Sequence, residues 1–199
     1  MDRLDQEKAE LRKSLRAKRA EARANWAVAH PDASAEDVMR EHLTRAGLWR
    51  DEAIVGVFLP IRSELDPVAM VRGIARAMAL PVMVEKDAPL AFRIWQDGDP
   101  LVARAWGIRE PEATAPECAP DIVIVPLLGV DRQGYRIGYG GGFYDRTLAK
   151  LRAANTKLLA VGIGYDEQIV DSVPRGPYDE PVDAILTPAG LTMVAPAQS

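Results

Sequence analysis

The segment 136–146, Arg-Ile-Gly-Tyr-Gly-Gly-Gly-Phe-Tyr-Asp-Arg, constrains the fold of this chain more than any other feature. It lies between a long apolar run at 121–130 and a helix-like segment at 144–154, so it joins a buried strand to a helix. Its four glycines let the backbone adopt positive φ and approach a ligand closely. Backbone N–H groups at such a junction bind anions. Arg136 and Arg146 bracket the loop and Asp145 offers a carboxylate for a metal ion, so the segment predicts phosphate chemistry.

Helices and strands alternate along the chain. Apolar spacing and capping residues predict helices at 3–29, at 34–48, at 68–79 after Pro67, and at 144–154. Strands are predicted at 54–59, 81–85, 90–95, 122–126, 157–165 and, as the last, 184–187. Strand 122–126 is apolar almost throughout, which indicates burial on both faces of a mostly parallel sheet. The pattern predicts an α/β fold with ligands beyond the carboxyl ends of the strands, where the glycine loop, 60–64 and 165–167 lie.

Length and composition fit one domain over residues 1–199. The chain is 48% hydrophobic and 27% charged, and its 199 residues suffice for one full α/β core but not for a second independent domain. No apolar run is long enough to span a membrane, and the N-terminus is charged rather than signal-like. A single cysteine, Cys118, excludes an internal disulfide and fits a reducing compartment. We therefore expect a cytoplasmic protein with no membrane partner.

Positive charge is concentrated near the N-terminus. Residues 1–25 hold eight Lys or Arg against five Asp or Glu, whereas the other 174 residues carry a net charge of −7. This balance argues against general nucleic-acid binding. Lys8, Arg12 and Arg19 lie within about 40° of one another around a helix, so they share one stripe. The stripe is either a solvated basic face or a set of cations that folds over the glycine loop to hold a triphosphate.

The glycine loop matches neither common phosphate-binding motif. No Gly-Lys-Ser/Thr follows the glycines, so it is not a P-loop, and Phe143 stands where the dinucleotide fingerprint needs its third glycine. A turn that only reverses the chain is an alternative, but two guanidiniums and a carboxylate around the loop favour a ligand site. The two histidines, His30 and His42, fall in the helical N-terminal region, where surface positions are expected.

Five segments together make the chain resemble the 5-formyltetrahydrofolate cyclo-ligase family, also called 5,10-methenyltetrahydrofolate synthetase. They span nearly the whole chain in the family's order, and the glycine signature is the specific one. The segments are Lys8-x3-Arg12-x6-Arg19, Phe58-Leu59-Pro60 with Glu64 and Asp66, Gly107-Ile-Arg-Glu-Pro111, the loop Asp131 to Arg146, and Val173-Pro174 with Asp179 and Asp183 to Thr187.

The resemblance implies a single three-layer α/β/α domain with a basic N-terminal helix (1–29) packed over a nucleotide site. It also implies a ligase of one-carbon metabolism that closes 5-formyltetrahydrofolate to 5,10-methenyltetrahydrofolate, with ATP as co-substrate and Mg²⁺ as cofactor. ATP would phosphorylate the formyl oxygen, N10 of the folate would attack the activated carbon, and phosphate would leave beside ADP. Phosphoryl transfer needs mainly positioning and charge stabilisation. ATP and the folate would be the partners of a monomer.

The resemblance further implies roles for individual residues. Arg136, Asp145 and Lys8 would be catalytic, and Asp145 and Asp179 would bind Mg²⁺, which usually takes one or two protein carboxylates plus phosphate oxygens and water. ATP would contact Lys8, Arg12, Arg136, Ile137, Gly138, Tyr139, Gly140, Gly141, Gly142, Phe143 and Tyr144. The folate would contact Leu59, Glu64, Trp106, Tyr139, Gly140, Gly141, Gly142 and Phe143, with Glu64 accepting hydrogen bonds from the pterin and Trp106 stacking on a planar ring.

Blander roles remain open for three of these residues. Asp179 could be a turn residue after Pro177, Glu64 could cap the helix opened by Pro67, and Trp106 could be a core residue. The chain also departs from the family pattern, because some members carry a basic residue in the glycine loop where this chain has Tyr139 and Gly141. Charge neutralisation must then depend on the N-terminal helix and Arg136.

Two other functional classes compete with the ligase. One is a different enzyme on a similar scaffold, such as a sugar-phosphate isomerase or an acyl-CoA transferase, which would not need a basic helix over the loop. The other is a non-catalytic folate- or nucleotide-binding protein. The joint presence of Arg136, Asp145 and Asp179 argues against simple binding, because binding alone does not require a metal pair.

Overall fold

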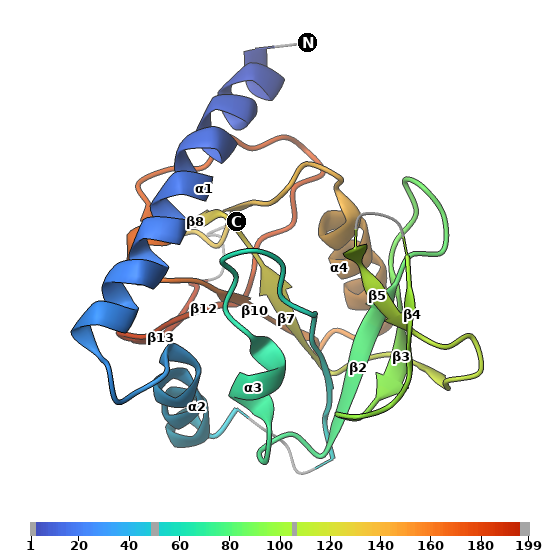
Figure 1. Cartoon of the computed structure of the whole chain (residues 1–199). Coiled ribbons are helices and arrows are strands. Elements are labelled where there is room, and N and C mark those ends of the chain that lie inside the picture. The colour runs from blue at the N-terminus through green and yellow to red at the C-terminus, as the bar shows by residue number, and fades with distance from the viewer. Residues whose placement is uncertain (1–2, 49–51, 105–106, 196–199) are drawn as a thin grey trace.

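The computed structural model of the protein describes residues 3–48, 52–104 and 107–195 (Figure 1). Its centre is an eight-stranded sheet in the order β13-β12-β10-β7-β1-β2-β3-β6 within these ranges. The strands are β1 (Ile54–Gly56), β2 (Ala77–Val82), β3 (Ala91–Trp95), β6 (Glu117–Cys118), β7 (Ile122–Pro126), β10 (Leu159–Ile163), β12 (Ala184–Thr187) and β13 (Gly190–Met193). The neighbours from β12 to β2 run parallel, and β13, β3 and β6 add antiparallel edges. The α/β class with a mostly parallel sheet is therefore confirmed.

Helices cover both faces of this sheet. Alternate residues of β7 face opposite cores, as the pleat requires. Ile124 packs in one core with Met39 and Leu43, whereas Val123 packs in the other with Leu148. One face is covered by α1 (Arg3–Ala29), α2 (Ala35–Ala46) and α3 (Pro67–Val71), and the other by α4 (Phe143–Ala154), which lies behind the sheet in Figure 1.

The topology creates a crevice at the junction of β1 and β7. From β1 the chain crosses through α3 to β2, its neighbour on one side. From β7 the chain crosses through α4, on the opposite face of the sheet, to β10, its neighbour on the other side. The two connections diverge between these adjacent parallel strands. Ligands of open α/β sheets bind outside the carboxyl ends of the strands at such a switch point.

Two small sheets and a 3-10 helix lie beside the central sheet. They are the hairpin β4 (Leu101–Ala103) and β5 (Arg109–Pro111), the three-stranded sheet β11-β8-β9 formed by β8 (Gly129–Asp131), β9 (Arg136–Ile137) and β11 (Ile169–Val170), and η2 (Asp166–Gln168). Buried Asp131 stabilises the turn between β8 and β9, because its carboxylate accepts hydrogen bonds from the N–H groups of Gln133, Tyr135 and Val173 at 2.9–3.1 Å. This turn fixes the position of β9, which leads directly into the glycine loop.

Several predicted boundaries are confirmed, and one element is wrong. Helix 3–29 matches α1, and Ser34 caps α2 as predicted, accepting a hydrogen bond from the Asp37 N–H at 3.0 Å. The helix predicted at 68–79 ends at Val71, and residues 77–82 form strand β2. Its alanine-rich sequence favours a helix, but burial between β1 and β3 overrides that propensity. Strands 54–59 and 157–165 are shorter than predicted. Of the strand predicted at 81–85, only residues 81–82 lie in a strand, β2, which begins at residue 77. Strand β13 follows the strand predicted as last.

No helix in the described ranges is both long and apolar enough to cross a membrane. The prediction that residues 1–199 form one domain stays a prediction.

Candidate active site

A cavity of about 620 Å³ lies at the switch point. Its wall includes residues that follow β1, the end of β2 and the end of β7, represented by Leu59, Pro81 and Pro126. The volume falls within the range of small-molecule sites, roughly 300–1,000 Å³. The structure brings nearly all of the sequence-predicted site residues to this wall: Lys8, Arg12, Leu59, Glu64, Arg136, Ile137, Gly138, Tyr139, Gly140, Gly141, Gly142, Phe143, Tyr144, Asp145 and Asp179. The remaining one, Trp106, falls outside the described residues.

The glycine loop links β9 to α4. Gly140 and Gly142 have φ of 99° and 64°, a region that strains other residues. Gly142 is the N-cap of α4 and offers no side-chain cap, so the first N–H groups of the helix lack both an intrahelical acceptor and that cap. Arg146 binds the Gly141 carbonyl at 2.8 Å. The loop therefore presents amides at a helix N-terminus, which suits an anion.

Helix α1 contacts this loop through Arg12, which favours the second of the two readings of the cation stripe. Lys8 Nζ is 2.5 Å from an Asp179 carboxylate oxygen, and Arg12 Nε donates to the Gly138 carbonyl at 3.1 Å. Arg19 does not belong to the described wall of the cavity and is only 2% exposed. Arg19 is thus neither solvated nor part of the described cavity wall. The shared helical stripe of Lys8, Arg12 and Arg19 therefore does not give all three residues the same role.

Arg136 is buried close to the two candidate metal ligands. It donates to Asp145 at 3.0 Å and to the Glu180 carbonyl. Burial lowers the pKa of Arg136, while the charges of Asp145 and Asp179 oppose that shift. The cavity wall therefore contains a buried arginine that interacts with the charges of both carboxylates.

The donor set at these carboxylates fits Mg²⁺ that is shared with a phosphate. Within the described residues no cluster of three or more His, Cys, Asp or Glu is arranged to hold a metal. Among the described residues, Asp145 accepts hydrogen bonds at Oδ1 and Asp179 accepts them at Oδ2. Two carboxylates beside an anion loop match the way Mg²⁺ is usually bound, through one or two carboxylates plus substrate phosphates.

Glu64 also belongs to the cavity wall. Burial raises its pKa, and the Ile61 N–H, the Arg19 charge and a Tyr139 hydrogen bond oppose the shift. Its Oε2 accepts from the Ile61 N–H at 2.8 Å and its Oε1 from Arg19 at 3.3 Å. The alternative role, capping the helix after Pro67, is wrong, because Asp66 is that cap and accepts from the Val68 N–H at 2.9 Å. Asp179 does accept the Gly176 N–H at 2.6 Å, so its turn role coexists with a place at the cavity.

Sequence reasoning missed several wall residues. Leu80, Pro81 and Met83 line the cavity but are not among the predicted site residues. The sequence predicts a helix to residue 79 and a strand from residue 81, so it does not indicate that β2 ends at the cavity. Glu110 is buried, accepts from the Met83 N–H at 2.9 Å and pairs with Arg104 at 2.9 Å. The Gly-Ile-Arg-Glu-Pro match around it was the available signal.

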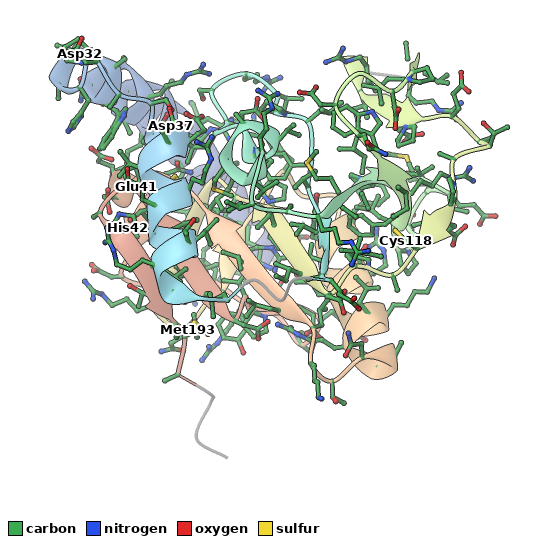
Figure 2. The ribbon with its side chains drawn as sticks, turned by 90° about the horizontal axis from the view of Figure 1, so that it is seen from below. Asp32, Asp37, Glu41, His42, Cys118 and Met193 are labelled. Atoms are coloured by element: carbon green, nitrogen blue, oxygen red, sulfur yellow. The ribbon has the colours of Figure 1, made fainter. Side chains whose placement is uncertain are left out.

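Cys118 and the histidines lie outside the described wall of the cavity. Figure 2 shows His42 on α2 and Cys118 on opposite sides of the molecule, and His42 is 3.0 Å from the Pro188 carbonyl. Burial raises the pKa of the Cys118 thiol to about 11, so the thiol is protonated and unreactive at neutral pH. Of the two histidines expected at the surface, His30 is exposed and His42 is half-buried.

The fold and the cavity define an α/β protein whose switch-point site joins a glycine loop suited to an anion to a buried carboxylate. Its sequence matches the 5-formyltetrahydrofolate cyclo-ligase family over residues 4–188. The chain belongs to this family and, as a member, is an enzyme of the ligase class. The family resemblance seen in the sequence is confirmed.

Individual relatives agree with this assignment. The 5-formyltetrahydrofolate cyclo-ligase of Escherichia coli strain K12 is 35% identical over 143 residues, or 68% of this chain and 78% of that protein. The Haemophilus influenzae protein of the same name is 29% identical over 88% of this chain and 96% of its own length. The NMR structure of Aquifex aeolicus 5,10-methenyltetrahydrofolate synthetase is similar with a TM-score of 0.75 and 25% identity, over 96% of this chain and 95% of that one.

Proposed function

We propose that this enzyme cyclises 5-formyltetrahydrofolate to 5,10-methenyltetrahydrofolate with ATP, releasing ADP and phosphate. One observation carries the proposal: a single cavity joins the glycine loop, with its cations, to the buried carboxylate Glu64. A loop of amides and cations suits a polyphosphate, and a carboxylate that accepts hydrogen bonds suits the N–H groups of a pterin. Family membership supports the same substrates.

The first step transfers the γ-phosphoryl group to the formyl oxygen. The formyl oxygen attacks phosphorus, and the bond between phosphorus and the oxygen of ADP breaks. The loop amides, Lys8, Arg12 and Arg136 hold the phosphates and stabilise the charge that spreads over them, which is the main demand of phosphoryl transfer. This use of the cavity explains a site rich in amides and cations.

Asp145 and Asp179 would hold Mg²⁺, which neutralises charge on the nucleotide phosphates when bound. Arg136 orients Asp145 through the hydrogen bond of 3.0 Å between them. Lys8 Nζ lies 2.5 Å from a carboxylate oxygen of Asp179. We infer that Lys8 exchanges this carboxylate for a phosphate oxygen when ATP enters.

The second step closes the ring. N10 of the folate attacks the activated formyl carbon, the carbon–oxygen bond breaks, phosphate leaves and N10 gives up its proton. Leu59 and Glu64 hold the pterin so that N10 lies near the carbon, and Tyr139 and Phe143 border it from the loop. Such fixed placement replaces a chance encounter by an intramolecular one.

The absorbance of methenyltetrahydrofolate in the near ultraviolet tests this function directly. The purified protein with ATP, Mg²⁺ and 5-formyltetrahydrofolate should produce that absorbance, and mixtures without ATP should not. A folded protein that gives no rise would refute the proposal. Binding of both substrates without any turnover would favour the non-catalytic alternative.

We further propose that the enzyme is a cytoplasmic monomer without nucleic-acid or membrane partners. A net charge of −4 and the single cysteine of the sequence support this assignment. Light scattering on the purified protein checks the monomer, because a dimer would double the mass of 21.8 kDa.

A further inference from the structure

Arg19 connects three separate parts of the cavity from behind its wall. Its side chain is 3% exposed and lies on α1. It donates to Ser63 Oγ at 3.1 Å, to Glu64 Oε1 at 3.3 Å, to the Leu127 carbonyl at 3.4 Å and to the Tyr139 hydroxyl at 2.8 Å. These partners follow β1, follow β7 and lie in the glycine loop. One guanidinium therefore joins both strand ends of the switch point to the loop.

A purely stabilising role explains this arrangement poorly. Burying a charged pair removes two ions from water, and that cost can exceed their mutual attraction, so apolar replacements of similar volume often stabilise a protein. The side chains of Arg19 and Glu64 are 3% and 5% exposed, and Glu64 also reaches the cavity. Retaining a buried pair at a binding wall is better explained by the orientation that it imposes on Glu64.

Tyr139 completes the connection. Its hydroxyl accepts the Arg19 hydrogen bond and also contributes a hydrogen bond that favours the ionised form of Glu64. The ring lies under the guanidiniums of Arg16 and Arg19, at 5.6 and 5.8 Å from the ring centre. Tyr139 occupies one of the two loop positions without the basic residue that some family members carry. In this chain the positive charge is supplied by Arg19 of α1, which contacts the loop through its hydrogen bond to the Tyr139 hydroxyl.

We propose that Arg19 is a positioning residue that holds Glu64 and the glycine loop in register, with the Tyr139 hydroxyl as the link. The proposal rests on the proposed function, in which Glu64 contacts the pterin and the loop holds ATP. Arg19 touches neither substrate. It sets the distance between the folate contact and the phosphate loop, and this distance decides whether the formyl oxygen meets the γ-phosphate.

Tyr139→Phe is the first test, because it removes only the hydroxyl and keeps the ring. The KM for 5-formyltetrahydrofolate should rise about tenfold, since a hydrogen bond to a charged group is lost on the folate side. The KM for ATP should change less than about threefold, because Arg12 and Arg146 still hold the loop carbonyls. An unchanged KM for the folate would overturn the proposal.

Arg19→Gln and Arg19→Lys are the second test. The glutamine variant should raise the KM for the folate by about tenfold or more, and the lysine variant should recover part of the loss because it keeps the charge. In the Arg19→Gln background, Tyr139→Phe should add little, since residues that act as a unit are not additive. Additive effects of the two substitutions would make Arg19 a packing residue. So would a fall in kcat that only follows the folded fraction of the protein while KM stays constant.

Arg23→Gln is the matched control. Arg23 lies one turn further along α1 and donates to the Arg62 carbonyl at 3.0 Å, but it is exposed and touches neither Glu64 nor Tyr139 in any contact found. Its loss should leave both KM values within about twofold of the wild type. If the wild type itself gives no turnover, the proposed function fails. The dissociation constants of the same variants for 5-formyltetrahydrofolate then still test the link.

Discussion

At the scale of single residues, Glu64 makes a prediction about pH. Burial raises its pKa above the ordinary value of 4.5, so the folded protein holds this proton at pH values where the unfolded chain has released it. The contribution of Glu64 to the free energy of unfolding is therefore greatest at low pH and falls as the pH rises above about 4.5.

Glu64→Gln removes that contribution. Urea denaturation at about pH 4, 5.5 and 7 should show the stability of the wild type falling relative to the variant as the pH rises. Glu52→Gln, at an exposed glutamate, is the control and should give parallel curves. A difference that grows in favour of the wild type would contradict the raised pKa.

Asp145 makes a second prediction at this scale. Asp145→Asn keeps the shape but removes the charge that pairs with Arg136 and that we propose binds Mg²⁺. We expect kcat to fall by about 100-fold or more, because phosphoryl transfer depends on charge stabilisation. Asp97→Asn removes an exposed partner of Arg72 and should leave the rate unchanged. A wild-type rate in the Asp145 variant would remove this residue from the metal site.

At the scale of elements, a comparison of two glycines tests whether the glycine loop binds a ligand or only reverses the chain. Gly140 and Gly47 both have positive φ, at 99° and 62°, but Gly47 caps α2 with nothing within 4 Å of an added Cβ. Alanine at either position should cost roughly 1–2 kcal/mol of stability. Only Gly140→Ala, whose Cβ would lie 3.2 Å from the Arg12 guanidinium carbon, should also raise the KM for ATP. Equal kinetics in the two variants would return the loop to a simple chain reversal.

Helix α1 makes the matching prediction for its basic stripe. Lys8→Ala should raise the KM for ATP about tenfold, because it removes a largely buried cation from the phosphate side of the cavity. Lys13→Ala, at an exposed position of the same helix, should leave the KM unchanged. If both variants behave alike, α1 supplies a solvated basic face and not a set of phosphate ligands.

At the scale of the whole molecule, ligands join parts that the chain keeps apart. The cavity lies between α1, both strand ends of the switch point and the loop before α4, so a nucleotide bound there stabilises all of them at once. ATP at a hundredfold its dissociation constant should add about 2.7 kcal/mol to the free energy of unfolding. With EDTA present, the rise in Tm on adding ATP should shrink and turnover should stop, and excess Mg²⁺ should restore both. An equal rise in Tm with and without EDTA would refute the proposed metal.

Local signals predicted much of this fold and most of the candidate site. Helix α1 follows from its apolar spacing, α2 from its Ser34 cap, and the glycine loop from positions that need positive φ. Residues 77–79 could not be assigned this way, because their alanine-rich sequence favours a helix in isolation but forms part of strand β2 between β1 and β3. The place of Arg19 could not be predicted either, since a helical stripe gives an angle but not the depth of burial.

The sequence by itself determined the class of fold and the family and predicted phosphate chemistry at the loop, because periodicity, capping and glycine conformation act over a few neighbouring residues. Only the tertiary structure decided which of these residues share a wall. The divergence of the crossovers from β1 and β7 put Leu59, Glu64 and the glycine loop around one cavity. Packing of α1 across that opening then sent Lys8 and Arg12 to the loop and buried Arg19 behind it. Such contacts join positions more than a hundred residues apart, and no local pattern contains that information.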